Sequence, residues 1–217
     1  MMTQTLRTTK GNIGVVYLFT NSLYEMENTY KYGISIQPFK RKQTQKNSTP
    51  PTHPFYDRIV MFSPKYKEIE KWLGERFKAE DFLLHGDGGK EWVQADFNVL
   101  LEIFKEALLT FPETTLCHGG KGYRVENGVI QIGNLPSCRL DLLRILDGDT
   151  IKCIKNGKTF VVRDNKIEVD GSLISLSSYI QQNFPRGGKT NQHNGYMYFT
   201  YKGEKIYDMW QSLVRAE

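Results

Sequence analysis

Two hydrophobic patterns near the start of the chain predict paired strands. Residues 15–20 are apolar on both faces, which is typical of a central strand. Residues 30–36 alternate, with tyrosine and isoleucine on one face and Lys31, Gly33 and Ser35 on the other. The second strand is therefore expected to pack through one face and to leave the other, small or charged, face beneath a bound ligand.

The patterns that follow predict a mixture of helices and strands. Apolar residues recur at four-residue steps over 65–79, as on an amphipathic helix, and Glu70 falls about 20° from Phe77 at the edge of the apolar stripe. The other expected elements are a short helix from Pro38 to about Lys46, a proline-rich loop at 47–54, a strand at 58–62 and a helix at 96–109.

A glycine-rich segment, followed by short stretches of alternating apolar and polar residues, divides the chain into two predicted domains. Residues 113–124 have the glycine content of a linker, so we expect domains at 1–112 and 125–217. Asn156-Gly157 is a strong hairpin signal. A helix is expected at 175–183, a strand at 194–203 and a last helix from about Ile206. The predicted class is α+β: a small, mixed or antiparallel three-stranded sheet flanked by helices, followed by a second small α+β domain.

Composition narrows the class of protein. The 217 residues are 39% hydrophobic and 24% charged, as in an ordinary globular protein. No apolar run approaches the roughly 20 residues of a membrane helix, so no membrane partner is expected. The three cysteines are scattered, which indicates neither a disulfide framework nor a zinc site and favours a cytoplasmic location.

Positive charge is concentrated after the second strand. The net charge is +5, and no acidic residue occurs from Ile34 to Tyr56. A basic cluster of this kind suits the phosphates of DNA. Its members are Lys40, Arg41, Lys42 and Lys46.

The order of motifs in the first 110 residues resembles the phage-type, DNA-binding branch of the GIY-YIG nuclease superfamily. The motifs are GVVYLFTN from Gly14, then Tyr30-Lys31-Tyr32-Gly33, Arg41, a Ser48-Thr49-Pro50 turn, Glu70 on a helix and Glu91-Trp92-Val93. Two positions depart from the pattern: Val15 stands in the glycine slot of the first motif, and Lys31 stands where the second motif has tyrosine.

The resemblance implies a catalytic set of Tyr17, Lys31, Arg41 and Glu70. In this interpretation Glu70 holds Mg²⁺ (or Mn²⁺), Tyr17 helps to deprotonate the attacking water, and Arg41 with Lys31 stabilises charge on the phosphate. Magnesium suits a single carboxylate because it keeps several waters and uses phosphate oxygens. A guanidinium can hold a phosphate through two parallel hydrogen bonds.

Each assignment has an ordinary alternative. Glu70 could form a salt bridge at the helix edge, with Arg76 as a nearby candidate. Tyr17 could be a core tyrosine with a satisfied hydroxyl. Lys31 could be a lysine on an exposed sheet face.

DNA contacts are expected in both domains. Lys40, Lys42 and Lys46 would neutralise backbone phosphates, and His53 could donate to one. The segments DGSLISLSSYIQQNF and NGYMYFTYKGEKIYDMW resemble a small domain found beside such nucleases and in restriction-modification proteins, whose inferred role is to contact DNA. Arg186, Lys189 and Asn191 in the loop between them are the expected contacts, although a polar surface loop has the same composition.

The sequence therefore predicts a divalent-metal-dependent DNA endonuclease, with restriction or mobile-element biology as a fitting context. The alternative is a catalytically inactive protein that grips DNA with the same cleft. Cutting both strands with one site per chain would favour a homodimer or two sequential nicks.

Overall fold

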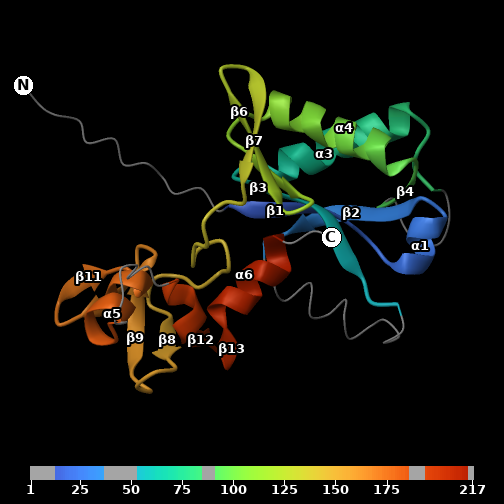
Figure 1. Ribbon diagram of the computed structural model, residues 1–217. Coiled ribbons are helices and arrows are strands. Elements are labelled where there is room, and N and C mark those ends of the chain that lie inside the picture. Colours follow the sequence, from blue (N-terminus) through green and yellow to red (C-terminus); the bar gives the residue numbers. More distant parts are fainter. Residues whose placement is uncertain (1–12, 37–52, 85–90, 186–193, 215–217) are drawn as a thin grey trace, which may run out of the picture.

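The computed structural model describes residues 13–36, 53–84, 91–185 and 194–214, and within them it contains two antiparallel sheets (Figure 1). The first has seven strands in the order β4-β2-β1-β3-β5-β6-β7, and the second has six in the order β11-β10-β9-β8-β12-β13. The predicted α+β class is confirmed. The predicted three-stranded size was wrong, because β4 extends one edge of the sheet and β5–β7 extend the other.

The centre of the first sheet consists of the predicted strands. β1 (Gly14–Thr20) lies between β2 (Thr29–Ser35) and β3 (Tyr56–Ser63) and is buried throughout. The register places Tyr17 opposite Gly33 of β2 and Val60 of β3. β4 (Trp92–Gln94) adds to the outer edge of β2 opposite residues 29–31, and the Tyr32 backbone N–H donates to the Glu91 carbonyl just before it.

Two amphipathic helices cover one face of this sheet. α3 (Tyr66–Ala79) and α4 (Phe97–Thr110) bury apolar side chains against Val16 and Leu18 of β1. Asp96 caps α4 by accepting a hydrogen bond from the backbone N–H of Asn98. A short helix that the pattern did not predict, α1 (Ser22–Met26), follows β1 and is capped in the same way by the Asn21 side chain.

The segment expected to be a glycine-rich linker, 113–124, lies inside the first sheet. It contains β5 (Thr115–His118) and the start of β6 (Lys121–Glu126), which pairs with β7 (Val129–Asn134). Gly119 and Gly120 form the hairpin turn with φ of 55° and 71°, a region that L side chains rarely adopt. The glycines therefore serve a tight turn between paired strands.

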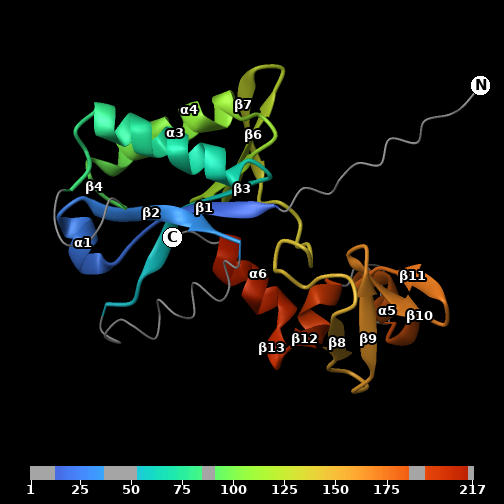
Figure 2. The same ribbon diagram turned by 180° about the vertical axis from the view of Figure 1, so that it is seen from behind.

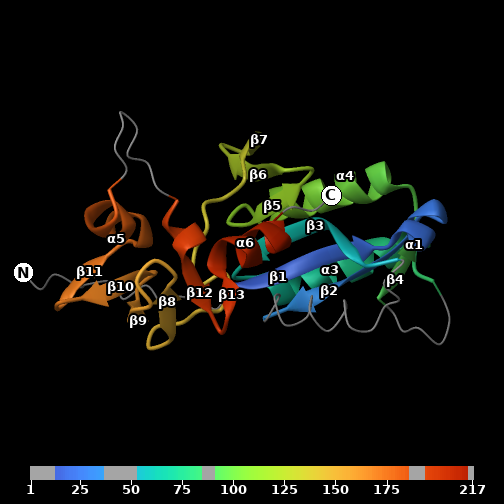
Figure 3. The ribbon, with the colours of Figure 1, turned by 60° about the horizontal axis from the view of Figure 1, so that its bottom comes forward.

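The second sheet is built from hairpins. The strands are β8 (Thr150–Cys153), β9 (Thr159–Arg163), β10 (Lys166–Val169), β11 (Ser172–Ile174), β12 (Phe199–Tyr201) and β13 (Glu204–Lys205). The turn predicted at Asn156-Gly157 joins β8 to β9, with φ of 71° at the glycine. α5 (Leu176–Asn183) covers one face of this sheet (Figure 3).

Part of the strand predicted at 194–203 was wrong. Gly195–Tyr198 form the 3₁₀ helix η1, and only Phe199–Tyr201 are extended. The cause is a close contact: a Cβ on Gly195 would lie 2.3 Å from the backbone of Leu176 and Ser177. The chain must turn where it passes the start of α5.

The last helix connects the two sheets. α6 (Ile206–Val214) begins directly after β13 and lies on the face of the first sheet opposite α3 and α4 (Figures 1 and 2). The Trp210 ring stacks on Phe62 of β3 with 5.8 Å between ring centroids. One continuous core therefore runs from β1 and β3 through α6 into the second sheet. No helix among the described residues is long and apolar enough to cross a membrane.

Removing the Trp210 ring tests this connection. Trp210 is 3% exposed, so Trp210→Ala should lower the free energy of unfolding by about 3–5 kcal/mol in a denaturant titration. Asp208→Asn, on the exposed side of the same helix, should change it by less than about 1 kcal/mol. A loss below about 1 kcal/mol for Trp210→Ala would show that α6 contributes little to stability.

Candidate functional site

The Tyr17 hydroxyl lies over β2 at Gly33, where the absence of a side chain leaves room for it. A Cβ at Gly33 would lie 2.8 Å from the Tyr17 Oη, so the hydroxyl occupies the space that any other residue would fill. Tyr17 is 6% exposed and its ring lies beside Phe19, with centroids 5.3 Å apart. The ring is part of the core, and its polar end is directed across the outer strand.

Lys31 is on the same strand face as Gly33, two residues earlier. Its Nζ lies 3.2 Å from Glu91 Oε2 and 5.6 Å from the centroid of the Trp92 ring. The side chain is 21% exposed. The expected alternative, a lysine on an open sheet face, does not describe this residue, because Glu91 and Trp92 at β4 cover it.

Glu70 approaches the same strand from the opposite face, which carries α3. Partial burial raises the pKa of its carboxyl, and the neighbouring charge of Glu91 raises it further. Among the described residues no basic side chain pairs with Glu70. Arg76, the expected alternative partner, instead pairs with Glu80, and its Nε lies 3.3 Å from Glu106 Oε2.

Tyr32 completes this side of the strand. A Cβ at Gly74 of α3 would lie 3.1 Å from the Tyr32 hydroxyl, so this glycine lets the ring lie close beneath the helix. The pKa of Tyr32 is raised by burial and by the charges of Glu70 and Glu91. The hydroxyl therefore stays protonated at neutral pH beside two carboxylates.

These residues form one arrangement around the outer edge of β2, which we call the β2-edge site. Its members are Tyr17, Lys31, Tyr32, Glu70 and Glu91. Tyr17 and Lys31 lie on one sheet face, Tyr32 and Glu70 lie on the other, and Glu91 interacts with both groups. Three of the predicted residues therefore lie on or against β2, Tyr17 and Lys31 on one sheet face and Glu70 on the other.

Glu91 and Tyr32 were missed as site residues. Glu91 belongs to the Glu91-Trp92-Val93 motif, so its position carried a signal. Tyr32 was expected to pack inward, which it does, but its hydroxyl faces the carboxylates. The positions of Lys40, Arg41, Lys42, Lys46, Arg186, Lys189 and Asn191 lie outside the described residues.

His53 contacts the start of α1. Its Nδ1 is 2.9 Å from the Ser22 hydroxyl at the start of α1. A second polar cluster holds α1 to β3: the Glu25 carboxylate accepts hydrogen bonds from Tyr56 and Arg58. Arg58 also stacks on Phe97, 4.1 Å from the ring centroid. This cluster links three elements and is a structural clamp.

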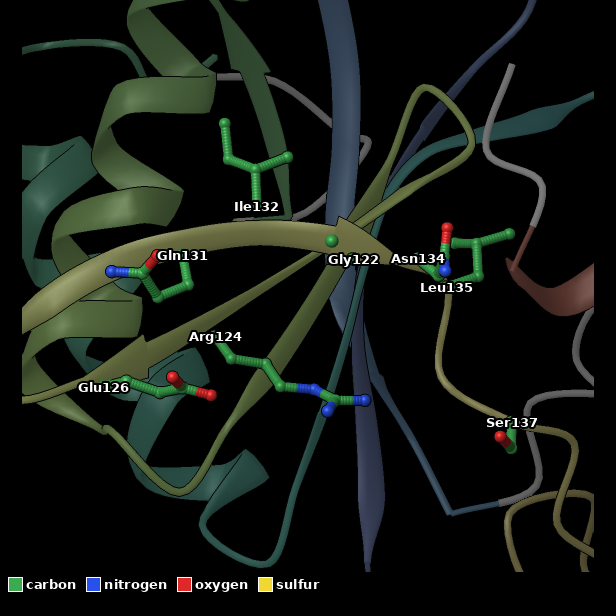
Figure 4. Close-up of a pocket in the computed structure, with 9 residues that line it drawn as sticks. Gly122, Arg124, Glu126, Gln131, Ile132, Asn134, Leu135 and Ser137 are labelled. Atoms are coloured by element: carbon green, nitrogen blue, oxygen red, sulfur yellow. The ribbon is translucent and has the colours of Figure 1, made fainter.

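The β6–β7 hairpin carries a separate open pocket of about 410 Å³ (Figure 4). Arg124 projects from β6 across it, and none of the residues of the β2-edge site lines it. The lining is Gly122, Arg124, Glu126, Gln131, Ile132, Gly133, Asn134, Leu135 and Ser137. The candidate chemistry therefore belongs to a strand edge and not to this hollow.

The comparison with protein families decides which domain carries this site. Residues 14–108 match the model of the T5orf172 domain. This region is therefore similar to a T5orf172 domain, and we use that name for residues 14–108. The family is one of phage domains related to GIY-YIG. The T5orf172 domain runs from β1 to near the end of α4 and contains every residue of the β2-edge site. Comparison with curated proteins and with solved structures gives no match.

The raised pKa of Glu70 predicts a pH-dependent stability difference. The folded T5orf172 domain holds the Glu70 proton more tightly than the unfolded chain, so wild-type stability falls as pH rises through the folded-state pKa. Glu70→Gln should therefore raise the free energy of unfolding at pH 7. The gain should vanish below about pH 4, where glutamate is protonated in both states.

Denaturant titrations from pH 3.5 to 8, run in parallel for both proteins, measure this difference. Glu68→Gln, at an exposed position of the same helix, is the matched control. A constant difference across the range would contradict the burial of the Glu70 carboxylate.

Proposed function

We propose that the T5orf172 domain hydrolyses phosphodiester bonds of DNA at the β2-edge site with the help of Mg²⁺ or Mn²⁺. The observation that carries this proposal is Glu70: a partly buried carboxylate with a raised pKa, next to a second carboxylate and without a basic partner among the described residues. Burial of such a group is costly unless it is compensated. A divalent cation would compensate it.

The donor set fits a hard cation that also uses phosphate oxygens. Among the described residues no three His, Cys, Asp or Glu side chains cluster in a way that could hold a metal, so the protein would supply Glu70, with Glu91 beside it. Such a small set of protein ligands suits magnesium, because the ion commonly binds one or two carboxylates and fills its remaining coordination positions with water and phosphate oxygens. When bound, the cation would polarise the phosphate and neutralise developing negative charge.

The chain's own residues have distinct roles in this proposal. The Tyr17 phenolate, favoured by the positive charge of Lys31, orients the attacking water and accepts its proton as the water oxygen bonds to phosphorus. A free tyrosine has a pKa of about 10, so the charge of Lys31 is needed near neutral pH. The bond from phosphorus to the leaving oxygen breaks, and that oxygen takes a proton from solvent. Tyr32, kept protonated, donates a hydrogen bond towards the carboxylates or a phosphate oxygen. Arg41 stabilises the phosphate in the transition state.

The basic residues after β2 would guide DNA to the site. Lys40, Lys42 and Lys46 are proposed to contact neighbouring phosphates, and Arg186, Lys189 and Asn191 a more distant stretch. A cytoplasmic protein acting in restriction or mobile-element biology, as a homodimer or by sequential nicks, would fit this activity.

One observation favours a second candidate, a DNA-binding protein without cleavage. Lys31 replaces the second-motif tyrosine and its ammonium group is already paired with Glu91. If that pair persisted on DNA, Lys31 would not stabilise the transition state, and the β2 edge would only hold the backbone.

Cleavage of supercoiled plasmid with Mg²⁺ separates these candidates. The wild type should nick or linearise the plasmid, and a chelator should stop it. Glu70→Ala should lower the rate by about 10²-fold or more, because it removes the charge that holds the cation. Glu75→Ala, on the exposed side of α3, should cleave like the wild type. Metal-independent cleavage, or full activity of Glu70→Ala, would contradict the proposal.

Gly33→Ala tests the position of the Tyr17 hydroxyl. The added Cβ would lie 2.8 Å from the Oη, so the ring must shift. We expect the cleavage rate of Gly33→Ala to fall by roughly 10- to 100-fold, because a small displacement of a catalytic group raises the barrier of the reaction. We expect a similar fall for Tyr17→Phe, which removes the hydroxyl. Circular dichroism and plasmid cleavage of the two variants measure this. Wild-type rates in both would remove Tyr17 from the reaction.

A further inference from the structure

The second sheet has an exposed face that carries lysine and threonine in a single row. The strand register aligns Thr159 of β9, Lys152 of β8, Thr200 of β12 and Lys205 of β13 across four adjacent strands. Side chains aligned in this way lie on the same sheet face. The other face is packed on α5, where Tyr179 contacts Phe160 and Phe199.

Two further lysines lie in the β8–β9 turn, next in sequence to the end of the row. Lys155 and Lys158 are exposed, and the Lys155 ammonium lies 5.3 Å from the centroid of the Tyr198 ring. The Lys152 side chain runs towards this turn, since its Cε is 3.9 Å from the position of a Cβ on Gly157. We call this surface the lysine face, defined by Lys152, Lys155, Lys158, Thr159, Thr200 and Lys205.

The lysine face has unbalanced positive charge. Within the described part of the chain, none of its four lysines forms a salt bridge with an acidic side chain. Glu168, on β10 of the same sheet, is occupied by Arg163, with 2.9 Å between Oε2 and Nε. The surface therefore offers ammonium and hydroxyl donors to an anionic ligand.

The donor types indicate which ligand. Lysines act as point charges and threonine hydroxyls as single donors, and both bind phosphate oxygens without reading base edges. The row contains no arginine for two-bond recognition of a carboxylate or a guanine. Neighbouring strands are about 4.8 Å apart, so the row presents repeated donors along a line, as a repeating phosphate backbone requires.

The lysine face is fixed to the T5orf172 domain. Lys205 ends β13, and α6 follows without an intervening residue and packs Trp210 on Phe62. DNA held on the lysine face would therefore have a fixed position relative to the first sheet.

We propose that the lysine face binds the sugar–phosphate backbone of duplex DNA, outside the stretch that enters the β2-edge site. The choice of DNA over another polyanion rests on the proposed function. The contact is independent of base sequence and sensitive to salt. It uses side chains of the sheet, in addition to the contacts proposed for Arg186, Lys189 and Asn191.

Fluorescence anisotropy with a labelled 30-base-pair duplex of arbitrary sequence tests this proposal, in Ca²⁺ to prevent hydrolysis. Lys152→Gln/Lys205→Gln should weaken binding on the order of tenfold at about 0.1 M salt and reduce the slope of log K against log salt by about 2. The matched control is Lys71→Gln/Lys78→Gln, which makes the same charge change on exposed positions of α3 and should bind like the wild type.

Several results would overturn the proposal: unchanged affinity and slope in the Lys152/Lys205 variant, an equal loss in the α3 control, or wild-type binding to anionic vesicles or polyglutamate but not to DNA. The proposed hydrolysis is tested separately, by measuring cleavage alongside binding. Glu70→Gln should keep the full lysine-dependent affinity while cleaving nothing. If the wild type binds DNA through the lysine face but does not cleave it, the proposed hydrolysis is refuted and the proposed DNA binding by the lysine face is still supported.

Discussion

The register of β2 between β1 and β4 is the constraint on which the site depends. β4 pairs with residues 29–31, the Tyr32 backbone N–H donates to the Glu91 carbonyl, and β1 places Tyr17 opposite Gly33, which has no side chain. The Tyr17 hydroxyl can therefore lie over β2 from one face, while Tyr32 and Glu70 lie against the strand from the other. Glu91, directly before β4, pairs with Lys31 of one face, and its charge raises the pKa of Glu70 on the other.

A second constraint is the shared core beneath the first sheet. The β1–β3 face opposite α3 is buried by α6, so Tyr17 and Phe62 belong to the same apolar cluster as residues of the second sheet. In this arrangement the T5orf172 domain depends on the C-terminal part of the chain to cover one of its faces. In our proposal the DNA-contacting surfaces of the two sheets act on one duplex, because α6 connects both sheets.

Local patterns were sufficient for the elements near the site. The alternation over 30–36 and the four-residue steps over 65–79 predicted β2 and α3, and they placed Glu70 at the edge of the buried stripe. α1 was missed because five residues are too few to show a period. The Gly119-Gly120 turn was interpreted as part of a linker because a tight hairpin and a linker share the same composition. The pairing of β5 with β6 across this turn goes together with the pairing of β5 with β3, a contact between distant segments that local sequence patterns do not reveal.

The same limit applies to the candidate site. Lys31 and Glu70 were identified through motif order, yet their relation through Glu91 follows from the pairing of β4 with β2, a contact between segments about 60 residues apart. The central claim is that the two faces meet at the β2 edge around a divalent cation. Paramagnetic broadening by Mn²⁺ in a ¹H–¹⁵N spectrum tests it most directly. The account predicts selective loss of the amide signals of residues 32–35, Glu70 and Glu91. Broadening confined to the β6–β7 pocket, or none at all, would contradict it.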